Sequence, residues 1–142
     1  MKTIIYYFTS TGNSLAVARI LASQLENAEL VNIAKVVNEE VRPECYFLGI
    51  STPVYCWGLP NIVVKFLRKL APRNAPYIFG LATCGGMPGA TLRQMKEILA
   101  EQSLKLSSGF SFTGYNIPAL SICPDWMIFL LSRKSVNDLM II

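Results

Sequence analysis

The segment Thr9-Ser10-Thr11-Gly12-Asn13-Ser14 places four hydroxyl side chains around one glycine. An apolar run at 3–8 precedes it, and an apolar helical pattern at 15–21 follows it. The free N–H groups at the start of a helix point toward a bound anion, and the helix dipole favours negative charge there. The hydroxyls add further donors, and Gly12 lets a ligand approach the backbone closely. This segment therefore predicts a site for a phosphate group.

Two common phosphate-binding patterns do not fit this segment. A nucleoside-triphosphate loop requires Lys before the Ser or Thr, and a dinucleotide loop requires Gly-x-Gly-x-x-Gly. No Lys or Arg lies between Lys2 and Arg19. A neutral loop suits one phosphate monoester held by backbone and hydroxyl groups, as in a mononucleotide. The simpler alternative is an ordinary turn in which Ser or Thr caps the helix.

A second segment, 52–60, displays Tyr55 and Trp57 beside Gly58. Aromatic rings on a loop are suited to stack on a planar heterocycle. Gly58 offers a backbone amide that can change orientation near the edge of such a ring. The alternative is that the two aromatic side chains only cover the edge of the core.

A third segment, 83–89, contains the adjacent glycines Gly85 and Gly86. Their N–H groups can approach the carbonyl edge of a flat ring and stabilise charge that develops there. The alternative is a loop shaped by turn chemistry alone. Cys56 and Cys84 lie in these loops, but the chain has no His to activate a thiol. We therefore interpret both cysteines as incidental rather than catalytic.

Composition narrows the class of protein. The chain has 142 residues, of which 52% are hydrophobic and 15% charged, with a net charge of +4 and no His. This predicts one compact domain over 1–142 and excludes acid–base catalysis or metal binding by histidine. None of the four cysteines forms a Cys-x-x-Cys pair, so no metal centre is predicted.

Sequence patterns also bear on location and partners. No signal peptide is recognisable and the apolar runs are too short to span a membrane, so we expect a cytoplasmic protein. The basic residues are scattered, and no nucleic-acid partner is predicted. The densest basic group is expected to be a solvated helix face or, alternatively, a docking patch for an acidic partner. That group consists of Lys65, Arg68, Lys69 and Arg73.

Hydrophobic periodicity predicts strands alternating with helices. Such alternation is typical of an α/β fold with a doubly wound parallel sheet, in which ligands bind beyond the carboxyl ends of the strands. All three loops described above follow predicted strands and should meet at that edge. The predicted strands are 2–8, 28–33, 44–51, 76–82 and 106–114, the predicted helices are 13–26, 60–70 and 90–102, and 34–43 is a loop or short helix.

These three segments together resemble the flavodoxin family, over nearly the whole chain to about residue 115. The similarity is greatest to the flavodoxin-like domain that is fused to a ferredoxin domain in some proteins. The resemblance implies a three-layer fold with five strands in the order 2-1-3-4-5, and FMN as the cofactor. It assigns the phosphate to Thr9, Ser10, Thr11, Gly12, Asn13 and Ser14, the ring faces to Pro53, Val54, Tyr55, Trp57 and Gly58, and the pyrimidine side to Thr83, Cys84, Gly85 and Gly86. Tyr115 and Asn116 would complete the rim.

The expected function is electron transfer by bound FMN, with a redox protein of ferredoxin type or a small acceptor as partner. Two alternatives remain, an FMN-dependent reductase of quinones or similar small acceptors and a flavin-free interaction module. The chain departs from typical flavodoxins because it is basic, and it lacks the clustered cysteines of the fused ferredoxin domain. The C-terminal part 122–142 is atypical, because 122–131 is strongly apolar and the last three residues are Met140, Ile141 and Ile142. This predicts burial in the fifth helix region, a homodimer interface or a truncated chain.

Overall fold

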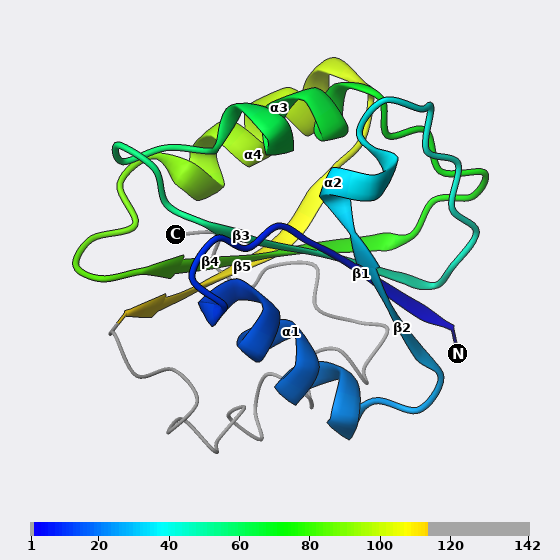
Figure 1. Ribbon diagram of the computed structural model, residues 1–142. Helices are drawn as coiled ribbons and strands as arrows, with labels where there is room; N and C mark the ends of the chain where they lie inside the picture. Colours follow the sequence, from blue (N-terminus) through cyan, green and yellow to red (C-terminus); the bar gives the residue numbers. More distant parts are fainter. Residues whose placement is uncertain (1, 114–142) are drawn as a thin grey trace.

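The computed structural model describes residues 2–113, which form a parallel sheet with helices on both faces (Figure 1). The predicted alternation of strands and helices is confirmed, and the stretch after the second strand contains a short helix. The strands are β1 (Thr3–Tyr7), β2 (Ala28–Asn32), β3 (Phe47–Pro53), β4 (Tyr77–Cys84) and β5 (Leu106–Thr113), and the helices are α1 (Asn13–Gln24), α2 (Ile33–Val36), α3 (Asn61–Arg68) and α4 (Thr91–Glu101).

The five strands lie in the order β2-β1-β3-β4-β5, and all four neighbouring pairs are parallel. This is the order that the sequence predicted. The central strands β1, β3 and β4 are almost entirely buried, because helices cover both faces. The order reverses between β1 and β3, so the carboxyl ends of these strands flank the crevice in which such sheets bind ligands.

The two faces of the sheet have separate hydrophobic cores. On one face α1 packs Val17, Ala18 and Leu21 against the sheet. On the other face α3 and α4 bury side chains that include Phe66 and Met95, and Figure 1 shows α2 on this side as well. Burial of each apolar stripe fixes its helix in place and thereby fixes the loop that enters the helix.

The helix α4 packs closely on the sheet at a glycine. A Cβ atom at Gly80 would lie 2.7 Å from the sulfur of Met95 and 3.1 Å from a methyl carbon of Leu92. Because there is no side chain at this position, the first turns of α4 can approach β4. This contact matters for the site, since the same turns of α4 contact the loop that follows β3.

Two strands end later than the sequence predicted. The β3 strand runs to Pro53 and β4 runs to Cys84, so residues 52–53 and 83–84 belong to strands rather than to loops. The Val54 N–H continues the pairing by donating to the Thr83 carbonyl at 3.0 Å. The β3 strand also begins at Phe47 rather than at 44, and Tyr46 just before it is 57% exposed. Local hydrophobicity could not locate these ends because cross-strand pairing decides them.

Several sequence predictions lie outside the described residues. They concern Tyr115, Asn116 and the apolar segment 122–142. Among residues 2–113, no helix is long and apolar enough to cross a bilayer.

Candidate functional site

The loops that follow β1, β3 and β4 meet at the carboxyl edge of the sheet, at the left of Figure 1. Two cavities of about 240 and 400 Å³ lie among them. Both cavities are lined by Val54, Cys84 and Gly85, so they adjoin each other. The smaller is also lined by Ser10, Thr11, Asn13, Pro53, Tyr55 and Thr83, and the larger by Cys56, Trp57, Gly86 and Met87.

The first loop leaves the N-terminus of α1 open to a ligand. The Gly12 N–H donates to Thr9 Oγ1 at 2.9 Å, which closes the turn. Gly12 precedes the helix with φ at 96°, a value that favours glycine, and a Cβ there would meet nothing within 4 Å. No side chain caps α1, and its first turn contains no acidic residue. The alternative of a Ser or Thr cap is therefore not what the structure shows, and the helix end can receive an anion.

Ser14 differs from its neighbours in this loop because its side chain faces inward. It is 1% exposed, and its hydroxyl lies 2.8 Å from the Thr83 hydroxyl at the end of β4. The Ser51 hydroxyl in turn donates to the Ser14 carbonyl at 2.8 Å. These bonds join β3, β4 and the start of α1. A hydroxyl has one hydrogen, so Ser14 can donate to a ligand only while Thr83 donates to Ser14.

The second loop is a tight turn in a strained conformation. Tyr55 and Gly58 exchange two backbone hydrogen bonds of 2.9 Å, and the central residues Cys56 and Trp57 have φ of 47° and 59°. Such turns usually have Asn or Gly at these positions, because bulky residues rarely adopt positive φ. Each residue held this way costs about 1–3 kcal/mol and persists only when its surroundings enforce it.

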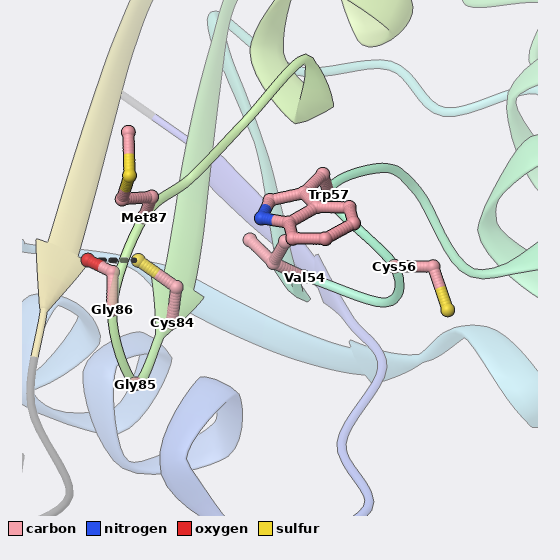
Figure 2. A pocket seen from close by; sticks show the side chains of 7 residues that line it. All are labelled: Val54, Cys56, Trp57, Cys84, Gly85, Gly86 and Met87. Carbon is pink, nitrogen blue, oxygen red and sulfur yellow. Dashed lines mark hydrogen bonds between the residues drawn. The ribbon is translucent and has the colours of Figure 1, made fainter.

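The turn displays aromatic side chains at the cavities rather than over the core. Trp57 is 71% exposed and Tyr55 is 41% exposed. Tyr55 contacts Phe8 edge to face, with ring centroids 6.2 Å apart. The Trp57 indole lies at the wall of the larger cavity, beside Val54 (Figure 2). The alternative in which these rings only cover the edge of the core does not match their exposure.

The structure places Gly58 away from the cavities. It is buried, and a Cβ at this position would lie 2.7 Å from Gln94 Oε1. The nearest atoms to that position all belong to Gln94. Gly58 therefore leaves room for the end of the Gln94 side chain, and its side of the turn faces α4.

The third loop is small and open. A Cβ at Gly86 would meet nothing within 4 Å, and Met87 beside it is 74% exposed. The Cys84 sulfur lies 3.8 Å from the Gly86 carbonyl and 3.6 Å from Thr113 Oγ1. This places the sulfur between the third loop and β5.

The cysteines near the cavities do not face each other. Figure 2 shows the Cys84 sulfur directed toward Gly86 and the Cys56 sulfur directed away from the cavity. Burial raises the pKa of the third described thiol, Cys45, which lies in the core.

Sequence reasoning missed three residues near the site. Met87 and Cys56 line the larger cavity, and their position inside loops already singled out was a usable signal. Gln94 contacts the second loop from α4, where it accepts a hydrogen bond from Leu59. A lone polar residue within a helical pattern gives no sign of such a contact, because the partner lies 35 positions away in the sequence.

Comparison with known proteins identifies the fold. The chain matches no protein-family model and no curated protein. Its structure is similar to that of oxidised flavodoxin 1 from Bacillus cereus, with a TM-score of 0.61 and 16% identity over 83% of this chain and 89% of the other. It is also similar to Megasphaera elsdenii flavodoxin, with a TM-score of 0.59 and 16% identity over 77% and 84%. An azoreductase from Bacillus anthracis gives a TM-score of 0.54 and 10% identity over 92% and 94%. The chain thus has the flavodoxin-like fold.

Proposed function

We propose that this chain binds FMN without a covalent bond and serves in electron transfer. The observation that carries the proposal is the pair of adjoining cavities at one edge of the sheet. One has hydroxyls beside a helix N-terminus, and the other has an exposed indole opposite a glycine-rich loop. FMN combines a phosphate with a planar ring, so its two ends match the chemistry of the two cavities. The likeness of the fold to flavodoxins supports the same proposal.

The charge of the loop residues also suits this cofactor. None of the loop residues 8–14, 53–61 and 83–91 is charged. A phosphate would be neutralised by the dipole of α1 and by hydroxyl and N–H donors, with no carboxylate to repel it. In this assignment Ser10, Thr11 and Asn13 contact the phosphate, while Thr9 and Gly12 shape the turn.

The remaining proposed contacts surround the ring. Trp57 and Met87 would cover its faces, while N–H groups of Gly85 and Gly86 would reach its polar edge. Val54 and Cys84, which line both cavities, would border the passage between them, and Pro53, Tyr55 and Thr83 would line the smaller cavity. Ser14 and Gly58 would support these loops from behind. Bound FMN would supply the electron-accepting chemistry, and the chain would supply binding and a dry apolar contact.

A titration of the purified protein with FMN tests the proposal. We expect a shifted visible flavin spectrum and quenched flavin fluorescence, with saturation at micromolar FMN or below. Riboflavin should bind more weakly because it lacks the phosphate. The absence of any spectral change at tens of micromolar FMN would refute the proposal and favour the flavin-free module.

A reductase acting on small acceptors is the second candidate, and the uncharged rim favours it. Electron carriers find protein partners by complementary charge, which steers their encounter. The three loops offer no charge for such steering, and the stretch 106–124 after α4 also lacks charged residues. An uncharged planar acceptor such as a quinone needs no steering and can stack on exposed apolar surface.

The dependence of the reoxidation rate on the charge of the acceptor distinguishes the electron carrier from the reductase. The reduced flavoprotein should be reoxidised by a neutral naphthoquinone and by its sulfonated analogue at rates within about threefold of each other. Neither rate should change more than about twofold between roughly 0.01 and 1 M salt, although screening changes greatly over that range. Stopped-flow absorbance of the flavin measures both. A large low-salt advantage for one acceptor charge would instead favour a charged protein partner.

Other parts of the proposal concern the whole chain. We propose one FMN-binding domain over residues 1–142, located in the cytoplasm, with a ferredoxin-type protein or a small acceptor as redox partner. The similarity of its motifs to the flavodoxin domain of ferredoxin fusions motivates the first partner. A homodimer through 122–142 is a further proposal, which sedimentation analysis would test.

A further inference from the structure

The strained turn at Tyr55–Gly58 is held at three points, one in α4 and two at residues 89–90, which directly precede α4. The Ala90 N–H donates to the Trp57 carbonyl at 2.8 Å. The Leu59 N–H donates to Gln94 Oε1 at 2.9 Å. Gly89 packs against the Trp57 backbone so closely that a Cβ there would lie 2.6 Å from the Trp57 carbonyl oxygen. Positive φ at two bulky residues requires such enforcement from outside the turn.

Gln94 is the only side chain among these three contacts. The other two come from the backbone at 89–90, so they remain when the Gln94 side chain is replaced. Gln94 lies in the first half of α4, which the contact of Met95 with Gly80 fixes on the sheet. The amide of Gln94 therefore connects the turn that carries Trp57 to a helix packed on the central sheet.

We propose that Gln94 is a positioning residue that keeps Trp57 at the wall of the larger cavity. Its Oε1 atom accepts from the Leu59 N–H and thereby fixes the end of the turn, while Gly58 leaves room for the amide. Loss of this bond lets the turn relax toward ordinary backbone angles, and the indole leaves the cavity wall. The expected effect on flavin binding rests on the proposed function. The expected effect on the conformation of the turn is independent of it.

Substitutions at Gln94 separate the hydrogen bond from the bulk of the side chain. Gln94→Leu removes the acceptor and keeps the approximate volume, whereas Gln94→Glu keeps an acceptor oxygen. Amide hydrogen exchange of Leu59, measured without flavin, should accelerate about tenfold in Gln94→Leu and little in Gln94→Glu. FMN should bind about three- to tenfold more weakly to Gln94→Leu, and the flavin midpoint potential should shift.

A second variant removes the same bond from the other side. Gly58→Ala places a Cβ where the end of the Gln94 side chain lies, so the amide must move away. Leu59 exchange should then accelerate as in Gln94→Leu, and the double variant should be no faster than either single variant. Gln102→Leu, at the exposed end of the same helix, is the matched control and should leave both readouts unchanged. Circular dichroism establishes that each variant is folded.

The outcomes decide the proposal whether or not flavin binds. Unchanged Leu59 exchange in Gln94→Leu would overturn the proposed role in the turn. Faster exchange with unchanged FMN affinity and potential would overturn the role in positioning Trp57. If the unmodified protein binds no FMN, the proposed function fails, while Leu59 exchange together with the indole N–H chemical shift of Trp57 still decides the positioning role.

Discussion

Replacing Ser10 and Thr11 together with alanine is expected to weaken FMN binding about 10- to 100-fold and to leave riboflavin binding unchanged. Both side chains line the smaller cavity at the start of α1. Hydrogen bonds from hydroxyls to a charged phosphate contribute about 1–3 kcal/mol to binding. Riboflavin has no phosphate, so its affinity does not depend on these bonds. Fluorescence titration of both ligands against the unmodified and the double-variant proteins measures the difference.

A serine elsewhere on α1 provides the control for this experiment. Ser23 is exposed and donates to the Ile20 carbonyl, far along the helix from the site. Ser23→Ala should leave both affinities unchanged. Equal losses for FMN and riboflavin in the double variant would indicate a disrupted loop rather than lost phosphate contacts. No loss for either ligand would place the phosphate away from this loop.

Replacing Trp57 with alanine should weaken FMN and riboflavin by the same factor, about 5- to 100-fold. Stacking of an aromatic side chain on a planar heterocycle contributes about 1–3 kcal/mol, and both ligands have the same ring. The midpoint potential should also change, because the proposed contact of the indole with one face of the flavin ring would be lost. Titration and spectroelectrochemistry give the two readouts, and Trp57→Phe should be intermediate.

Tyr46 offers a matched exposed aromatic outside the site. It precedes β3 at the opposite edge of the sheet and is 57% exposed. Tyr46→Ala should leave flavin affinity and potential unchanged. If Trp57→Ala behaves like Tyr46→Ala, the indole is not part of the binding site. The two experiments together test the two ends of the ligand separately, since one discriminates between FMN and riboflavin and the other does not.

The sequence predicted the order of strands and helices well, because this order depends on local patterns of apolar residues. Continuous apolar runs such as 45–50 predict buried parallel strands, and apolar residues at helical spacing predict the helices between them. Once strands and helices alternate, the rules of parallel connections leave few topologies. Loops after β1, β3 and β4 must then meet at one edge, and they do.

The composition of those loops also predicted which residues line the cavities. Ser10, Thr11 and Asn13 line one, and Trp57 and Gly86 line the other. Such loops lie at the carboxyl edge of a parallel sheet, which is where these sheets bind ligands. Which ligand occupies the cavities remains a prediction that the FMN titration tests.

Only the tertiary structure decided how individual side chains are directed and held. Ser14 has the same hydroxyl chemistry as Ser10, yet it faces inward because Thr83, 69 positions away, lies within 2.8 Å of it. The turn at Cys56 and Trp57 adopts angles that its sequence disfavours, because contacts from Gln94 and from the backbone at 89–90 enforce them. Side-chain direction at a loop and strain in a turn depend on partners that folding alone brings together. The local sequence contains the periodicity that predicts a helix or strand. It does not show which distant atoms a loop residue will contact.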